Sequence, residues 1–565
     1  MEIGLTRRQF LAGTSAMALG CARPVAADPV SSGASNQPYN VLLIIADDMG
    51  YGDLACHGNP YISTPHLDQL RQESTRFKRF YVSPVCSPTR ASLMTGRYNF
   101  RTGAVDTFMG RSTMFPDEVT LAEIMREAGY ATGLFGKWHL GDTFPSRPSD
   151  SGFQEVLCHM GGGIGQPSDP PGNGYFDPIL QHNGEFVPVQ GYCTDIFANA
   201  TIEFMKVNRD RPFFAYLSTN APHGPLEIAG RYYHRYASMG LDEQTARVYG
   251  MVENLDENVG NILSALTELG LAENTIVLFL TDNGPQASPV GVRFNSGMRG
   301  SKTTVYEGGI RVPCFVRFPG RIKADRDIEQ IAGHIDLMPT LLDMCDIPYT
   351  SEKKLDGISL KPLLEGESGN DPDRKLVLQW HRGEIPQPYR NCAVVTQQYK
   401  LINGTELYDI SNDPGEERDL AVVQPGTVDA LRNVYDAWFE EMRAERNFEL
   451  PRVWVGAPEQ NPVTLTRQDW RGDNKWDDTD VANRWEIQVV HEGRYDITLR
   501  YGRYRKPHTA QLKVMGNSYS QTLTGDTSEC RFSSIELPQG AGQLSALISA
   551  DDRDYTALYV DVKRL

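Results

Sequence analysis

The chain has 565 residues, too many for one ordinary domain, so we expect two or three folded units. Its composition, 40% hydrophobic and 22% charged, is ordinary for a globular protein and excludes extensive disorder. The formal net charge of −17 argues against nucleic acid or an anionic membrane as a partner, because like charges repel. A site for an anionic ligand would therefore have to be locally basic.

Residues 1–27 have the features of an export signal. Thr6-Arg7-Arg8-Gln9-Phe10-Leu11 resembles a twin-arginine signal, and a mildly apolar stretch too short to span a bilayer follows it. Small residues precede Asp28, as they do before a cleavage site. We expect an exported protein, periplasmic or secreted. A lipoprotein anchored through Cys21 is the less favoured alternative, because Leu19 stands one position late for a lipobox. No later segment is long and apolar enough to be transmembrane.

Three short apolar runs predict strands that are buried on both faces of a sheet, and each leads into polar residues. The runs are 41–45, which precedes Asp47-Asp48, 213–217, which precedes His223, and 275–280, which precedes Asp282-Asn283. Apolar residues at three- and four-residue steps between 251 and 266 predict a helix. Alternating strands and helices indicate an α/β layer fold, in which ligands bind beyond the carboxyl ends of the strands.

The remaining segments predict further parts of the molecule. Residues 142–192 are rich in Gly and Pro, and we expect long loops there that cover the site and select the ligand. A helix is predicted over about 427–446. Alternating runs such as 495–501 and 558–562 predict an antiparallel β-sandwich at the C-terminal end. Its tryptophans would fill the core or, less commonly, stack on sugar rings.

The most informative motif is Cys86-Ser87-Pro88-Thr89-Arg90. It continues through Ala91-Ser92-Leu93-Met94-Thr95-Gly96-Arg97, and a second segment, Gly129 to His139, follows. Together with Asp47-Asp48, His223, Asp282-Asn283-Gly284 and Lys302, these segments resemble the formylglycine-dependent (type I) sulfatases of the alkaline-phosphatase-like superfamily, in the order of that family. Glu406 to Pro414 is similar to the C-terminal subdomain of the same family.

This resemblance implies an alkaline-phosphatase-like sheet covered by helices, with a small C-terminal antiparallel-sheet subdomain and an appended all-β sandwich. We expect a catalytic domain over 38–350, the C-terminal subdomain over 351–450 and the accessory β-module over 452–565. Nine cysteines are spread along the chain without paired metal-ligand spacing, so a full disulfide framework is not implied, although one or two bridges remain open.

The resemblance also implies the chemistry. Cys86 would be oxidised to formylglycine (3-oxoalanine) by an oxygen-dependent maturation enzyme, and its hydrate would be the nucleophile. Oxygen ligands from Asp47, Asp48, Asp282 and Asn283, with position 86, would hold one divalent cation, Ca²⁺ in preference to Mg²⁺.

Five further side chains complete the implied active site. Arg90 would hold the diol, and His139 would orient it and assist its collapse. His223 would meet the leaving-group oxygen as general acid. Lys137 and Lys302, with His223, would bind the sulfate group. Lys137 and His139 stand at i and i+2 and would share one face of an extended segment.

We therefore predict an exported hydrolase of sulfate esters, with a sulfated carbohydrate or polysaccharide as substrate. Two alternatives stay open: a phosphate or phosphonate ester hydrolase on the same scaffold, and a glycan-binding protein with a decayed site.

Overall fold

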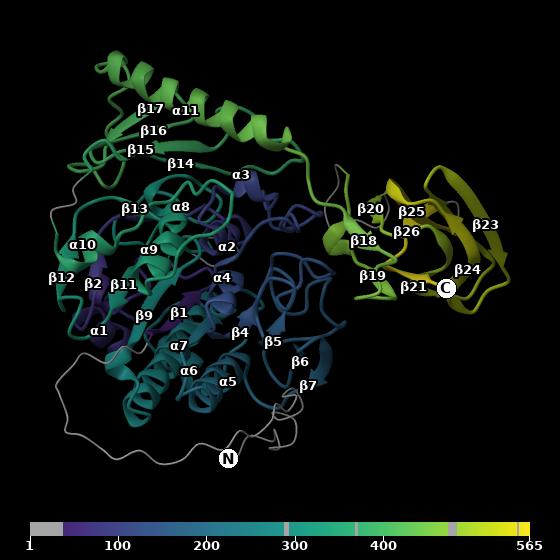
Figure 1. Cartoon of the computed structure of the whole chain (residues 1–565), viewed down its shortest axis with the longest axis horizontal. Coiled ribbons are helices and arrows are strands. Elements are labelled where there is room, and N and C mark those ends of the chain that lie inside the picture. The colour runs from purple at the N-terminus through teal and green to yellow at the C-terminus, as the bar shows by residue number, and fades with distance from the viewer. Residues whose placement is uncertain (1–37, 287–292, 368–370, 473–482, 551–552) are drawn as a thin grey trace, which may run out of the picture.

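A computed structural model describes residues 38–286, 293–367, 371–472, 483–550 and 553–565 (Figure 1). The twin-arginine-like segment, Cys21 and Trp476 lie outside these residues. Among the described cysteines every thiol is free. In the part of the chain that is described, no helix combines the length and apolar character needed to cross a bilayer.

The largest unit is built on one mixed sheet of ten strands in the order β12-β2-β11-β9-β1-β8-β4-β5-β6-β7. Its centre, from β9 to β5, is parallel. The strands are β1 (Asn40–Ala46), β2 (Thr75–Phe77), β4 (Ala131–Lys137), β5 (Glu155–His159), β6 (Ile179–His182), β7 (Glu185–Pro188), β8 (Phe213–Ser218), β9 (Thr275–Thr281), β11 (Cys314–Arg317) and β12 (Arg326–Ile328). The strands predicted from 41–45, 213–217 and 275–280 are β1, β8 and β9, all fully buried.

Helices cover both faces of this sheet (Figure 1). Leu42 and Ile44 of β1 belong to one buried cluster, whereas Val41, Leu43 and Ile45 belong to the other. The first cluster contains α1 (Pro65–Gln72), α5 (Cys193–Val207), α6 (Gly230–Ala237) and α7 (Glu243–Glu268); the second contains α2 (Cys86–Thr95), α4 (Leu121–Glu127), α9 (Leu337–Met344) and α10 (Lys361–Glu365). Because successive side chains of a strand point to opposite faces, an unbroken apolar run is what a sheet covered on both sides requires.

A second, smaller unit packs beside this sheet. Strands β14 to β17 form an antiparallel sheet that shares a buried cluster with α11 (Pro425–Arg446). The strands are β14 (Leu376–Gln379), β15 (Cys392–Val395), β16 (Tyr399–Ile402) and β17 (Glu406–Asp409). Leu431, Trp438 and Met442 face that cluster, as the predicted helical pattern requires. Short elements complete the two units: β3 (Phe80–Tyr81), β10 (Arg311–Val312), β13 (Ala332–Gly333), α3 (Asn99–Thr102) and α8 (Glu307–Ile310).

The C-terminal part of the chain forms two further sheets that enclose one core (Figure 1). Residues 452–565 are named here the β-module. One sheet contains β18 (Val453–Val455), β20 (Trp485–Val489), β22 (His508–Val514), β23 (Asn517–Leu523), β25 (Gly540–Ala550) and β26 (Arg553–Thr556); the other contains β19 (Val463–Leu465), β21 (Gly493–Tyr504), β24 (Thr527–Leu537) and β27 (Tyr559–Arg564). Trp470 and Trp485 are fully buried between the sheets. These two tryptophans therefore fill the core.

The segment 142–192 is only partly loop. It contributes β5, β6 and β7 to the edge of the large sheet, and its glycine-rich part, residues 161–163, remains irregular. The Gly and Pro content concealed these three strands because two of them are only four residues long.

Candidate active site

The acidic floor of the site forms where β1 and β9 end. The two strands are parallel and in register from Asn40↔Thr275 to Ala46↔Thr281, so Asp47 and Asp282 leave the sheet side by side. The backbone N–H of Asp48 donates to Oδ1 of Asp282 at 3.1 Å. Strand register alone therefore brings together carboxylates that are 234 residues apart in the chain.

Cys86 is the first residue of α2 and forms the floor of the site together with these carboxylates. Its Sγ is 3.4 Å from Oδ1 of Asp47 and 4.0 Å from Oδ1 of Asp48. Ligand atoms of Asp47, Asp48, Cys86 and Asp282 all lie within 4.8 Å of one another. The helix begins at Cys86 and is terminated by Gly96, which adopts the left-handed conformation with φ 66°. The first-turn N–H groups, which carry partial positive charge, thus lie at position 86.

A set of cations compensates the buried carboxylates. Lys137 Nζ is 2.8 Å from Asp47 Oδ2, Lys302 Nζ is 2.6 Å from Asp48 Oδ1, and Arg90 Nη2 is 2.7 Å from Asp282 Oδ2. Three carboxylates thus face three fixed positive charges, and the site is locally neutral although the chain as a whole is strongly acidic. This pairing removes the local negative charge that would otherwise repel an anionic ligand.

The electrostatic environment shifts the pKa values of the acidic groups in different directions. Burial would raise the pKa of Asp48, but Lys302, His223 and Lys137 outweigh it and hold that pKa well below its usual range. Burial, reinforced by Asp47, raises the pKa of Asp282 to about 6 despite Arg90. Burial and the neighbouring Asp282 also raise the pKa of the Cys86 thiol. An unmodified Cys86 is therefore a poor thiolate nucleophile.

Asn283 offers a ligand atom that the protein does not use. Its Nδ2 donates to Asp48 Oδ1 at 2.8 Å, whereas its Oδ1 is buried and has no hydrogen-bond partner among the described residues. A buried carbonyl oxygen without a partner beside three carboxylates fits a hard divalent cation, and the absence of histidine from the set disfavours zinc. The residues present therefore fit one Ca²⁺ or Mg²⁺ ion.

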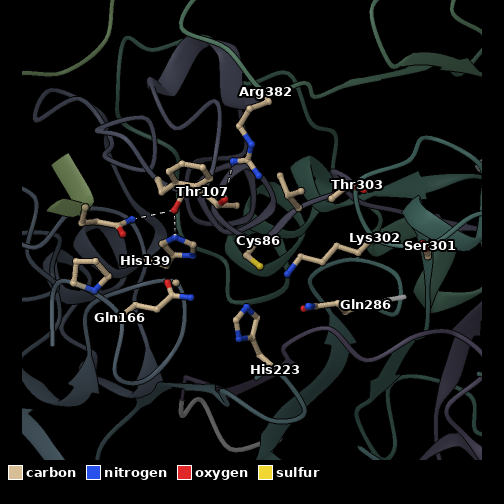
Figure 2. A pocket seen from close by; sticks show the side chains of 15 residues that line it. Cys86, Thr107, His139, Gln166, His223, Gln286, Ser301, Lys302, Thr303 and Arg382 are labelled. Atoms are coloured by element: carbon tan, nitrogen blue, oxygen red, sulfur yellow. Dashed lines mark hydrogen bonds between the residues drawn. The ribbon is translucent and has the colours of Figure 1, made fainter. Parts of the chain in front are cut away.

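A cavity of about 450 Å³ opens above Cys86 (Figure 2). Cys86, Lys302, His139 and His223 line it, whereas Lys137 and Arg90 are fully buried beneath. Its other lining residues are Val85, Thr107, Phe108, Gly162, Gln166, Pro167, Gln286, Ser301, Thr303, Arg382 and Gln468. Sequence reasoning identified the floor and the two histidines but missed the polar wall, because single Thr, Gln and Arg residues in loops carry no distinctive spacing.

The two histidines enter the cavity from different segments. His223 Nδ1 contacts the Gly224 carbonyl at 2.8 Å, and its Nε2 is 3.8 Å from Asp48 Oδ2. Burial lowers the pKa of His223 to about 4, partly opposed by Asp48. Burial and Lys137 lower the pKa of His139 well below its usual range. His139 has φ 61°, so β4 ends at Lys137 and the two residues do not share a face of an extended segment.

The glycine-rich segment 161–163 reaches both histidines. A Cβ atom at Gly162 would lie 2.8 Å from His139 Cε1, and one at Gly163 would lie 2.9 Å from His223 Cε1. Only residues without a side chain permit this close approach. The segment therefore covers the site, as the sequence predicted, although the strands around it were not foreseen.

Comparison with known proteins gives matches over the same residues. The family model "Sulfatase" matches residues 39–347, and the model "N-sulphoglucosamine sulphohydrolase, C-terminal" matches 300–442. Arylsulfatase A of Homo sapiens is 32% identical over 70% of this chain and 87% of its own. N-acetylgalactosamine-6-sulfatase of Canis lupus familiaris is 34% identical over 64% of this chain and 71% of its own.

Solved structures agree with these matches. The crystal structure of Ps i-CgsB in complex with k-i-k-neocarrahexaose superposes with a TM-score of 0.66 at 27% identity and covers 75% of this chain and 96% of its own. The structural neighbours share the helix-covered sheet, which confirms the predicted fold class. The chain therefore belongs to the formylglycine-dependent sulfatase family, the sulfuric ester hydrolases of the alkaline-phosphatase-like superfamily.

Proposed function

We propose that this sulfuric ester hydrolase is an exported enzyme that removes sulfate from a carbohydrate, with a formylglycine made from Cys86 as its nucleophile and one divalent cation, Ca²⁺ in preference to Mg²⁺. The observation that carries the proposal is the position of Cys86. It lies at a helix N-terminus, within contact of the carboxylate cluster, at the floor of a cavity that Lys302 and both histidines line.

The cation would be held by Asp47, Asp48, Asp282, Asn283 and an oxygen at position 86, and when bound it would polarise an ester oxygen and acidify a nearby hydroxyl. Hydrated formylglycine would supply one hydroxyl as nucleophile and a second whose deprotonation releases sulfate. Cys86 is 1% exposed, so the maturation enzyme would have to reach it before this part of the chain folds. That order suits twin-arginine export of an already folded protein.

Side chains of the protein would bind the sulfate group, position the diol and transfer protons. Lys302 lines the cavity and, with Lys137 beneath it, would attract the sulfate oxygens, and Arg90 would fix the position of the diol. The Gly224 carbonyl can only accept, so Nδ1 of His223 donates to it and Nε2 is the atom that gains and loses a proton. Nε2 of protonated His223 would donate to the leaving-group oxygen. His139 would accept a proton from position 86.

A carbohydrate substrate is supported by the polar cavity wall and by the relatives. Thr107, Gln166 and Arg382 offer donors and acceptors suited to sugar hydroxyls. One relative is named N-acetylgalactosamine-6-sulfatase, and the structural neighbour Ps i-CgsB was solved in complex with k-i-k-neocarrahexaose. We further propose the domain limits 38–350, 351–450 and 452–565, since the two family models together end at residue 442.

The test is release of sulfate from a panel of sulfated mono- and polysaccharides, measured by ion chromatography on protein co-expressed with a maturation enzyme. Mass spectrometry of the peptide that contains residue 86 should show an aldehyde in place of the thiol. An unmodified thiol in a fully active sample would refute the formylglycine. Faster turnover of an aryl phosphate than of the matched aryl sulfate would favour the phosphate or phosphonate ester hydrolase instead.

A further inference from the structure

Residues 106–112, named here the wall loop, belong to the catalytic unit but are held by all three units. From the second unit, Trp380 Nε1 and Arg382 Nη1 donate to Asp106 Oδ1 at 2.9 and 2.7 Å. From the β-module, the Gln468 carbonyl accepts from the Gly110 N–H at 2.8 Å. Met109 is 1% exposed and belongs to the core cluster of the β-module.

Among the described residues of the β-module, Gln468 is the one that lines the cavity. It lies in a short 3₁₀ turn, Arg467–Asp469, and is 5% exposed. Its Nε2 donates to the Thr107 carbonyl at 2.9 Å and to Ser112 Oγ at 3.1 Å. With the Gly110 contact, this one residue binds the wall loop at three points along its length.

The Thr107 carbonyl has a second partner, His139. Its oxygen is 2.7 Å from His139 Nε2, a contact drawn in Figure 2. A carbonyl can only accept, so Nε2 carries the hydrogen and Nδ1 of the neutral ring keeps a lone pair. His139 Nδ1 is buried and has no partner among the described residues, and His139 and Cys86 line the same cavity (Figure 2).

We propose that Gln468 is a positioning residue of the active site, supplied by the β-module. Through the Thr107 carbonyl it fixes the orientation and tautomer of His139, so that Nδ1 is presented as the proton acceptor. The proposal rests on the proposed role of His139 and goes beyond the family match, which ends at residue 442. The β-module is thus part of the catalytic apparatus in addition to any role in stability.

The Thr107 carbonyl accepts hydrogen bonds from two described side chains, and Gln468 supplies one of them. Without that amide, the carbonyl can turn away from His139, and the ring is then free to rotate or to change tautomer. A small displacement of a group that transfers a proton lowers turnover without weakening substrate binding to the same extent.

The test replaces Gln468 by Met, which has a similar length but no donor. We expect kcat on an aryl sulfate to fall roughly tenfold, the scale seen when groups that orient a site residue are removed, with KM changed less than about twofold. The matched control is Gln460→Met. Gln460 also joins the β-module to the catalytic unit, since its Oε1 accepts from the Phe144 N–H at 2.6 Å, but it does not line the cavity.

A double-mutant cycle makes the result specific to His139. In a His139→Ala background, Gln468→Met should have little further effect on the residual rate of an activated aryl sulfate, because the residue it positions is gone. An equal loss in both backgrounds, or an equal loss in the Gln460→Met control, would overturn the proposal. Melting temperatures of all variants separate positioning from unfolding. Absence of any sulfate release by the unmutated enzyme would instead refute the proposed function.

Discussion

The floor and the wall of the cavity are built in opposite ways. The floor consists of Asp47, Asp48, Cys86 and Asp282, which follow buried strands or begin a buried helix of one unit. The wall loop instead has little secondary structure of its own and depends on side chains from two other units. The comparison indicates that the reactive group is fixed by the rigid sheet, whereas the access to it is fixed by contacts between units.

The largest effect should come from Cys86, the floor residue proposed as the precursor of the nucleophile. Cys86→Ala should reduce sulfate release by at least roughly 10⁴-fold, because the nucleophile is lost, while the melting temperature changes little. Released sulfate and thermal unfolding measure the two quantities. Cys392→Ala, which removes another buried cysteine in β15, is the matched control and should stay active. Comparable activity of the two variants would contradict the assignment.

Removal of the cation should be nearly as severe. Chelated enzyme should lose activity and regain it with Ca²⁺, because the carboxylates of the floor would lose the charge they are arranged to hold. Asp282→Ala should lose bound metal and activity together, as measured by elemental analysis and sulfate release. Asp256→Asn alters another buried carboxylate, one that accepts from the Leu67 N–H, and should keep the metal. Full activity in verified metal-free enzyme would show that the ligand set is wrong.

Deletion of residues 452–565 tests whether the β-module holds the wall loop in place. It would expose Met109 and remove every Gln468 contact, so we expect lower soluble yield, a lower melting temperature and reduced turnover on both an aryl sulfate and a polysaccharide. A module that only recruits glycan would behave differently. Its deletion would raise KM on the polymer alone, because only remote binding energy would be lost.

The smallest expected effect concerns the contact between Asp142 of the catalytic unit and Asp469 of the β-module. Burial, reinforced by Asp142, raises the pKa of Asp469 well above its usual range, and burial also raises that of Asp142. The folded state binds the proton more tightly than the unfolded chain does. Protonation therefore contributes stability that is fully present below the pKa of the unfolded chain and is lost as pH rises through the pKa of the folded state.

Asp469→Asn should therefore raise the melting temperature by about 2 °C at pH 8 and change it little near pH 4. Scanning calorimetry across this pH range measures the difference. Glu459→Gln, at an exposed position of the same module, should show no such pH dependence. A destabilised Asp469→Asn protein at high pH would mean that the charged carboxylate is the stabilising form.

The floor was predictable from the sequence and the wall was not. Buried apolar runs placed β1, β8 and β9, and the motif around Cys86 identified the cavity floor, because both signals are local. Gln468 and Thr107 are 361 residues apart, and no spacing or composition around either indicates that they meet. The positive φ of His139 was also missed, since the i and i+2 spacing of Lys137 and His139 was interpreted as one extended segment.

The place of Met109 in the core of the β-module has a consequence for recombination. A side chain from the catalytic unit completes the hydrophobic core of the β-module, so the C-terminal piece lacks part of its core when the chain is cut near residue 451. Chimeric enzymes that exchange the C-terminal piece between relatives would have to exchange the short segment around Met109 as well. The segments that must be exchanged together are therefore far apart in the sequence.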